Sequence, residues 1–343
     1  MKLLITTQTV SENDQLLGFF VEWIRKFSNN FEKVTVFCLE KGEFDLPGNV
    51  EVVSFGRYRG VNKFKILFLL CVRSFNFRND YDAVFVHMNP IWMVSGGVIW
   101  KILRKKCFLW YTSKGVTLKL KVAEKLADKI FTASPESFRI KSKKVIVTGH
   151  GIDTELFKPL EHQQLTTHNE IRILSVGRIA PVKNYEVLIE AAKILKDEGV
   201  KFVAMIVGET PLDKDKEYAK KIKLEITDYQ LQNHFNFVGK VEHKNLPSHY
   251  LSHDIFVHLS KTGSLDKTLL EAMACGMNVL SSNDAAKAFL PPGLVFNENN
   301  AGELADKIKG ASQHKIDGKL REFVVENHNL DNLIDKISGL INK

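Results

Sequence analysis

The side chains best suited to binding an anion lie together in one short segment, SVGRIAPVKNYEVLIEAAKIL at 175–195. A predicted strand ends at Gly177, Arg178 follows at once, and Lys183 lies at the start of the next predicted helix. Backbone N–H groups at a helix N-terminus and two fixed positive charges all favour a phosphate group. The segment therefore predicts a pyrophosphate site, and the alternative is a basic loop whose side chains are solvated.

A second segment, residues 261–282, combines a polar loop with a carboxylate on the helix that follows. Its sequence, KTGSLDKTLLEAMACGMNVLSS, places Gly263 and Ser264 in the loop and Glu271 in the helix. Loop N–H groups can form an anion-binding concavity, and a carboxylate can accept hydrogen bonds from two neighbouring ribose hydroxyls. The alternative for Glu271 is a helix-surface residue in an i,i+4 network. A third segment, FVGKVEHKNLPSHY at 237–250, could present backbone groups to a nucleobase or be a plain connection between a strand and a helix.

The elements that must hold these segments alternate between short apolar runs and longer amphipathic runs. Alternating strands and helices indicate an α/β protein with parallel sheets and right-handed crossovers. Strands are predicted at 2–7, 33–39, 50–55, 83–88, 107–112, 129–133 and 144–148, and again at 171–176, 202–207, 235–238, 255–259 and 278–282. Helices are predicted at 15–27, 116–126, 184–198, 215–229, 268–274 and 330–341.

Length and polarity divide the chain into two Rossmann-like domains. The 343 residues exceed one ordinary doubly wound domain, and the segment 160–170, LEHQQLTTHNE, is polar and aperiodic. We therefore expect a first domain at 1–159, a linker at 160–170, a second domain at 171–326 and a last helix at 327–343. Two such domains are expected to face each other across a cleft, with ligands at the carboxyl ends of the strands.

Together these segments resemble the donor-binding domain of the family-four retaining glycosyltransferases with the GT-B fold. The matching text is VGR with Lys183, VGE at 207–209, FVGKV at 237–241 and LLEAMACGMNVLSS at 269–282, in the family's order and spacing. The likeness extends more weakly to ITTQTVSENDQLLGFF, similar to the first strand and acceptor-side loop, and to TGHGID before the linker. It implies a GT-B fold whose last helix crosses back to the first domain.

The resemblance also implies a reaction. A sugar would pass from a nucleoside-diphosphate sugar, with UDP or GDP as carrier, to a glycan or lipid-linked acceptor in polysaccharide biosynthesis. The anomeric configuration would be retained, with no metal and no further cofactor. Arg178 and Lys183 would bind the diphosphate and Glu271 the ribose. The remaining donor-binding residues would be Gly177, Gly208, Val241, Gly263, Ser264, Leu265 and Lys267, with Gly18 on the acceptor side.

Two positions depart from the family's pattern. Gly263 stands where the family usually has a Glu near the sugar hydroxyls, so Asp266 or Lys267 is expected to do part of that work. Ser113 stands where the family often has a His at the reaction centre. The expected catalytic set is therefore Arg178, Lys183, Asp266 and Ser113, and a catalytically inactive nucleotide-sugar-binding scaffold is the alternative.

Excess positive charge is confined to the first half of the chain. Residues 1–158 carry 25 Lys and Arg against 15 Asp and Glu, whereas the remainder carries 23 against 25. This asymmetry predicts an anionic partner. The segment 57–78, RYRGVNKFKILFLLCVRSFNFR, has six basic and no acidic residues among many apolar ones. It predicts a peripheral helix on an anionic membrane surface. The alternative is that Ile66, Leu67, Leu69 and Leu70 pack against the sheet.

Other classes of function fit the sequence less well. The strand pattern and aromatic spacing are not those of a nucleic-acid binder, and a sugar-nucleotide epimerase on the same fold stays an alternative. The four cysteines form no CxxC pair, as in a reduced cytoplasmic protein. The uncharged stretch 83–100 contains His, Asn, Pro and Gly, which argues against a transmembrane helix.

A few further residues could in principle bind a metal ion or the acceptor. Asp80 with Asp82, and Asp213 with Asp215, spell DxD, but their positions at element starts favour structural roles. The pair His249 and His253, four residues apart, is expected on a solvated helix face because no third ligand is evident. His87 ends a predicted strand and is either an acceptor contact or a hydrogen-bonded structural residue.

Overall fold

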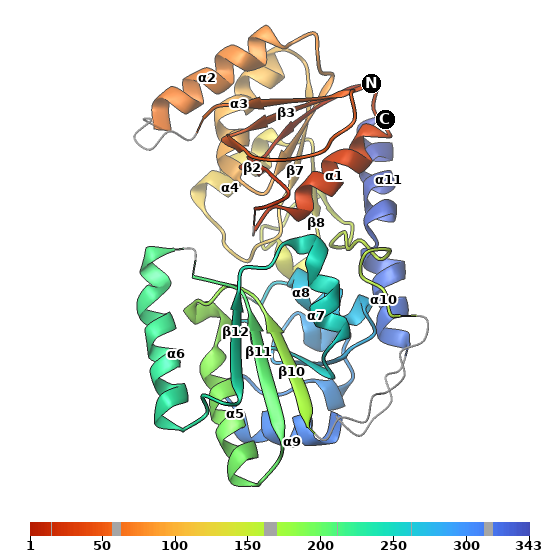
Figure 1. The fold of residues 1–343 in the computed structure, drawn as a ribbon. Coiled ribbons are helices and arrows are strands. Elements are labelled where there is room, and N and C mark those ends of the chain that lie inside the picture. The colour runs from red at the N-terminus through yellow and green to blue at the C-terminus, as the bar shows by residue number, and fades with distance from the viewer. Residues whose placement is uncertain (15, 57–62, 161–169, 211, 262, 312–317) are drawn as a thin grey trace. The chain divides into compact units, whose positions relative to one another are not determined.

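The computed structural model describes residues 1–343 except 15, 57–62, 161–169, 211, 262 and 312–317. It divides the chain into two compact units (Figure 1). The first unit contains Met1–Gly151 and His328–Lys343, and the second contains Ile152–Asn327. Each unit is built around one parallel sheet. The predicted α/β class with two Rossmann-like domains is confirmed.

The first unit has a seven-stranded parallel sheet in the order β5-β3-β1-β6-β7-β8-β9. Alternate side chains along each strand enter different clusters of buried residues, as the two faces of a strand require. Leu3 and Ile5 join one cluster, for example, and Leu4 joins the other. The strands are β1 (Lys2–Thr6), β3 (Lys33–Cys38), β5 (Val50–Ser54), β6 (Ala83–His87), β7 (Lys106–Trp110), β8 (Lys129–Thr132) and β9 (Val145–Val147), and a short parallel pair joins β2 (Thr9–Val10) to β4 (Glu40–Lys41).

Helices cover both faces of this sheet. One face packs against α1 (Phe19–Ser28) and the C-terminal helix α11 (Leu330–Ile341). The other packs against α2 (Lys63–Asn76), α3 (Pro90–Ile102) and α4 (Leu118–Leu126). Gly151 lies beside α1 and α11 with φ +70°, and a Cβ there would be 2.6 Å from the Trp23 ring. A glycine is therefore required where the chain leaves the first unit.

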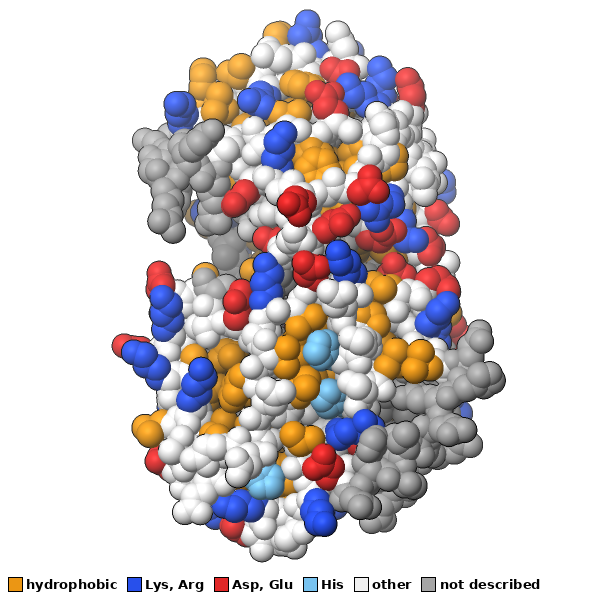
Figure 2. All heavy atoms as spheres, viewed as in Figure 1, with side chains coloured by type: hydrophobic (Ala, Val, Ile, Leu, Met, Phe, Trp, Pro, Cys, Tyr) orange, Lys and Arg blue, Asp and Glu red, His pale blue; other side chains and the backbone are white. Residues whose placement is uncertain are grey.

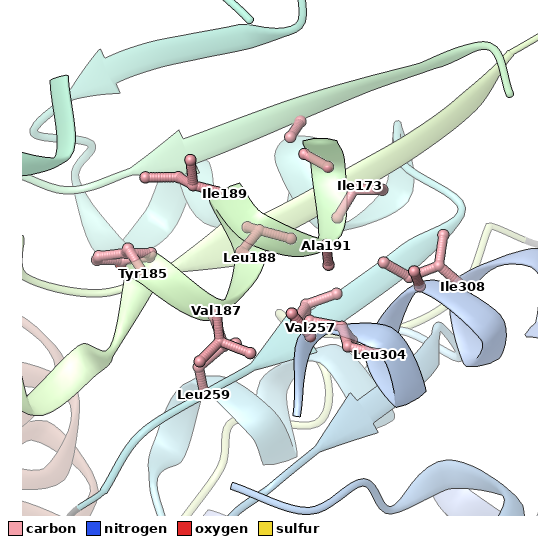
Figure 3. Close-up of a cluster of buried hydrophobic side chains, with 14 of the residues drawn as sticks. Ile173, Tyr185, Val187, Leu188, Ile189, Ala191, Val257, Leu259, Leu304 and Ile308 are labelled. Carbon is pink, nitrogen blue, oxygen red and sulfur yellow. The ribbon is translucent and has the colours of Figure 1, made fainter. Parts of the chain in front are cut away.

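The second unit has a five-stranded parallel sheet in the order β12-β11-β10-β13-β14. Its strands are β10 (Ile171–Val176), β11 (Phe202–Val207), β12 (Phe235–Gly239), β13 (Ile255–His258) and β14 (Asn278–Ser281). The helices are α5 (Tyr185–Asp197), α6 (Lys216–Asp228), α7 (Leu246–Leu251), α8 (Lys267–Ala274), α9 (Ala301–Ala311) and α10 (Lys319–His328). Figure 3 shows side chains of α5, β10, β13 and α9 pointing toward one another in the buried cluster on one face.

The boundary between the units differs from the predicted one. The sequence predicts that the first domain extends to residue 159, but the second unit begins at Ile152. The reason is packing: Ile152 and Phe157 are buried in the cluster formed with α7 and α8. Arg321 also donates hydrogen bonds to the carbonyl oxygens of Thr154 and Phe157, at 3.2 and 2.9 Å. Most of the predicted linker, 161–169, lies outside the described residues.

Two helices of the first unit differ from expectation. The stretch 83–100 is shared between β6 and α3, which the hydrophobic pattern did not reveal. In α2, Leu70 is fully buried, and Ile66 and Leu69 pack against the same cluster. These residues therefore pack on the sheet and do not form a membrane-facing side. No helix in the described parts of the chain is long and apolar enough to span a bilayer.

Candidate functional site

The sheet order of the second unit brings the two predicted chemical segments together. Strands β10 and β13 are neighbours, yet β10 connects in sequence to β11 on its other side. Ligands bind at such a switch point, beyond the carboxyl ends of the strands. Gly177 and Arg178 follow β10, and residues 260, 261 and 263–266 follow β13. Their shared edge is the candidate site.

Two glycines allow a close backbone approach at this edge. A Cβ on Gly208, just beyond β11, would lie 2.0 Å from the carbonyl oxygen of Gly177. No side chain fits there, so Gly208 has a steric reason to be glycine. A Cβ on Gly177 would lie 3.0 Å from Cε of Lys183, which shows that the lysine stem passes directly over Gly177. The Tyr185 hydroxyl donates to the Gly177 carbonyl oxygen at 3.0 Å and ties α5 to this turn.

Lys183 is paired with a carboxylate. Its Nζ lies 2.6 Å from Oδ2 of Asp266, and both side chains are mostly buried. The same oxygen receives a hydrogen bond from Nε2 of His258 at 3.1 Å. On the other side of the ring, Nδ1 of His258 lies 3.0 Å from the Ser281 hydroxyl. A connected chain of polar groups thus runs from β14 through β13 to the loop between β10 and α5.

The protonation states along this chain follow from its geometry. Burial alone would raise the pKa of Asp266, but the Lys183 charge and the hydrogen bond from His258 outweigh burial and hold that pKa well below its usual value. Burial lowers the pKa of His258. The neutral ring must therefore donate from Nε2 to the ionised Asp266 and accept at Nδ1 from Ser281.

Arg178 differs from Lys183 in having its charge uncompensated. It is half-buried. Within the described part of the chain, no hydrogen bond or ion pair engages its guanidinium group. A partly desolvated cation beside Gly177 favours an anionic ligand, and a guanidinium fork matches phosphate geometry well.

Glu271 lies on α8 and is 2% exposed. Its Oε1 lies 3.0 Å from Nε2 of His243, and its Oε2 receives a hydrogen bond from the Tyr250 hydroxyl at 3.1 Å. Burial would raise the pKa of Glu271, but His243, Lys267 and Tyr250 together lower it. The carboxylate is thus ionised and held in one orientation, with acceptor capacity left on both oxygens.

The remaining predicted donor residues lie in or beside the same loop. Gly263, Ser264 and Leu265 are buried, and Gly263 has φ +59°, in the left-handed region. Asp266 occupies the N-cap position of α8 but makes no capping hydrogen bond, because its side chain turns to Lys183 and His258. Val241 packs on the cluster beneath α7 and α8. Sequence and structure therefore agree on the segments, while the pairing of Lys183 with Asp266 is new.

Three predicted site residues, His87, Ser113 and Gly18, belong to the first unit. His87 is 2% exposed, stacks on Phe20 at 3.7 Å between ring centroids, and lies 3.1 Å from the Thr7 hydroxyl. This burial favours the structural alternative over acceptor binding. Ser113 accepts a hydrogen bond from the Gly115 N–H at 3.3 Å and is half-buried. At Gly18 a Cβ would lie 2.6 Å from two carbonyl oxygens of the preceding turn.

The residues considered as metal ligands have structural partners. Asp80 pairs with Lys33, and Asp213 pairs with Lys216. His253 is buried, and its Nδ1 lies 2.7 Å from the His249 carbonyl oxygen, so the expected solvated helix face is wrong for this residue. Helix α7 ends at Leu251, and the chain turns inward before β13. No cluster of three His, Cys, Asp or Glu side chains suited to a metal occurs among the described residues.

Sequence reasoning missed four residues that shape the site: Tyr185, His243, Tyr250 and His258. Only His258 left a signal, as a polar residue at the carboxyl end of the apolar run IFVHL. Tyr185 acts through Gly177, 8 residues away in the sequence. His243 and Tyr250 act through Glu271, which lies 28 and 21 residues away.

Known proteins resemble this chain in sequence and in fold. The profile of the family "Glycosyl transferases group 1" matches residues 157–330, just over half of the chain. The amylovoran biosynthesis glycosyltransferase AmsK of Erwinia amylovora is 33% identical over 186 residues, which are 51% of this chain and 44% of that protein. This chain therefore spans less than half the length of that relative. An uncharacterized 41.2 kDa protein in the cps region of Klebsiella pneumoniae is 22% identical over 313 residues, covering 81% of this chain and 80% of that protein.

Among solved structures, Anabaena HepE in complex with UDP and glucose superposes with a TM-score of 0.80. It covers 100% of both chains at 18% identity, so the likeness shows a shared GT-B fold. The matched profile contains the whole site edge from Gly177 to Glu271. The chain therefore belongs to the glycosyl transferases group 1 family.

Proposed function

We propose that this protein is an enzyme that transfers a glycosyl group from a nucleoside-diphosphate sugar to a glycan or lipid-linked acceptor. The observation that carries the proposal is the uncompensated, half-buried Arg178 at the carboxyl end of β10, on the edge that also holds Lys183. The preorganised carboxylate of Glu271 supplies acceptors for the two ribose hydroxyls. UDP and GDP are the proposed carriers, and UDP is the first to test because HepE was solved with it.

The proposed reaction retains the anomeric configuration, as the family resemblance implies. The bond between the anomeric carbon and the diphosphate oxygen breaks, and a bond to the acceptor oxygen forms on the same face. The acceptor's proton passes to the departing phosphate oxygen. Arg178 and Lys183 stabilise the charge that develops on that leaving group. We propose that these side-chain cations act without a metal ion, so a chelator should leave the rate unchanged.

The proposed setting is polysaccharide biosynthesis at the inner face of the cytoplasmic membrane. The name of the Erwinia relative supports the pathway class. The basic first half of the chain supports an acceptor held at an anionic surface.

An inactive nucleotide-sugar-binding scaffold is the second candidate, and Gly263 favours it because the family's usual carboxylate is missing there. Asp266, three residues later, offers a carboxylate on the same loop. We propose that Asp266 supplies the missing acceptor for the donor sugar, which keeps the enzyme active.

Incubating the protein with UDP-, GDP- and ADP-sugars, and measuring both Kd and released nucleoside diphosphate, tests the proposal. We expect binding of one nucleotide class and slow hydrolysis even without acceptor. Binding without hydrolysis or transfer would favour the scaffold, and no binding at all would refute both.

The pH dependence of donor binding is expected to report on Lys267. Burial lowers the pKa of Lys267 from 10.5 to about 8, although Glu271 and Asp153 attract its charge. The lysine is therefore charged at pH 7 and about nine-tenths neutral at pH 9. If its charge faces the bound diphosphate, the affinity for UDP should fall about tenfold from pH 7 to pH 9.

Titration calorimetry across this range, above the second phosphate pKa of about 6, makes the measurement. Lys267→Arg is the matched variant, because arginine stays charged and should give a flat profile. A flat profile in the parent protein would remove Lys267 from the donor site.

A further inference from the structure

The outer side of the α2, α3 and α4 layer carries an unusual number of exposed apolar side chains. Phe68, Val72 and Phe75 are 68, 37 and 50% exposed on α2, at the spacing of one helix face. Val98 and Ile102 on α3 are 58 and 74% exposed, and Leu118 on α4 is 78% exposed. Contiguous exposed apolar groups with polar residues around them are typical of protein or membrane interaction sites.

The three helices pack closely enough to form one surface. Trp100 of α3 donates to the Ser74 hydroxyl of α2 at 3.0 Å. A Cβ on Gly97 of α3 would lie 2.9 Å from Leu126 of α4. Helix α3 is therefore held between α2 and α4, and the apolar groups of all three belong to one layer. Figure 2 shows hydrophobic side chains exposed beside Lys and Arg in the region of α2.

Basic side chains are interspersed with these apolar groups. The Arg78 guanidinium lies 4.5 Å from the centre of the Phe75 ring, and both residues are exposed. The other exposed basic residues of the layer are Lys65, Lys101, Arg104, Lys106, Lys119, Lys121 and Lys125.

The nearby carboxylates are already engaged. Asp128 pairs with Lys101 at 2.6 Å, and Glu124 accepts from the Ser142 hydroxyl at 2.6 Å. Asp80 pairs with Lys33 at 3.0 Å. These three carboxylates stand against the eight exposed Lys and Arg residues named above, so the layer has a positive excess.

We propose that this α2–α4 face docks on a membrane rich in anionic phospholipid. Apolar groups at helix spacing can enter the boundary between headgroups and acyl chains while Lys and Arg meet anionic headgroups. A protein partner or a second copy would need its own acidic and apolar counterpart to this face. The proposal concerns the first unit and is independent of the donor site.

Co-sedimentation of the full chain with vesicles of phosphatidylcholine, with and without roughly one-third phosphatidylglycerol as the anionic lipid that attracts Lys and Arg, tests the proposal. We expect at least tenfold stronger binding to the anionic vesicles and a loss of that difference as salt rises. Two variants should each weaken binding: Phe68→Ser with Phe75→Ser, and Lys119→Ser with Lys121→Ser and Lys125→Ser.

The matched controls lie on α6 of the second unit, where Leu224 is 61% exposed, and on the 3₁₀ turn Asp213–Asp215 just before it, which carries Lys214. Leu224→Ser, and Lys214→Ser with Lys220→Ser and Lys223→Ser, should bind vesicles like the parent. Unchanged Tm and UDP affinity would show that each variant is folded and that the donor site is separate. Equal binding to both vesicle types, no binding at low salt, or face variants that behave like the controls would overturn the proposal. Dimerisation through this face, or binding to DNA in preference to vesicles, would overturn it as well.

Discussion

Replacing Arg178 by alanine is expected to lower kcat/KM for glycosyl transfer about 10²- to 10³-fold, the usual loss when one preorganised donor to a developing negative charge is removed. Arg178 is the cation at the site edge whose charge no described carboxylate offsets. Its full charge is therefore available to the leaving diphosphate. Steady-state kinetics with the preferred donor measures the effect, and Arg178→Lys should restore only part of the rate because the fork geometry is lost.

Arg172 provides the matched control for this variant. It lies near the start of β10, at the other end of the strand from Arg178, and forms an ion pair with Asp254 at 2.8 Å. Arg172→Ala removes the same type of side chain at the opposite end of β10, so it should lower Tm without changing kcat/KM at the assay temperature. Equal kinetic losses in the two variants would mean that Arg178 only stabilises the fold.

Strand positions could be predicted where an apolar run in the sequence is followed by a glycine that marks its end. β10 and β11 agree with the predicted bounds because each ends at a glycine, Gly177 or Gly208. Helix α3 could not be predicted from periodicity. It buries Trp92 and Trp100 yet also exposes Val98 and Ile102, so it is apolar on every side and shows no hydrophobic stripe.

The segments that form the candidate site could be predicted from the sequence, but the contacts between their side chains could not. Arg178, Lys183 and Glu271 lie in local strand-to-helix patterns that a sequence displays. The pairing of Lys183 with Asp266 joins residues 83 positions apart, across two neighbouring strands. Tertiary packing thus decides that Lys183 is neutralised by a carboxylate and that Arg178 is not. The same holds for the segment 57–78, where the sequence did not decide which apolar side chains pack on the sheet: in the structure α2 turns Leu70 toward the sheet and Phe68 outward.

Asp266→Asn is expected to make the protein bind UDP more tightly, by about 1–2 kcal/mol or about 5- to 30-fold. The ionised Asp266 shares Lys183 with any bound diphosphate and repels that diphosphate directly. Because the pKa of Asp266 is held well below its usual value, this charge is present throughout the neutral range. Removing it should strengthen UDP binding, slow product release and remove the carboxylate proposed to contact the donor sugar. Calorimetry gives the affinity, and single-turnover kinetics separates release from chemistry.

Lys183→Met supplies the decisive comparison, because the two partners of one ion pair should change UDP affinity in opposite directions. Breaking a mostly buried pair lowers stability from either side, so Tm should fall in both variants. UDP affinity should rise in Asp266→Asn and fall in Lys183→Met, since one loses a negative and the other a positive charge beside the diphosphate. Asp254→Asn, which breaks the ion pair with Arg172, should leave UDP affinity unchanged. If Asp266→Asn and Lys183→Met both weaken UDP binding, the pair only supports the fold, and the electrostatic role assigned to Asp266 is wrong.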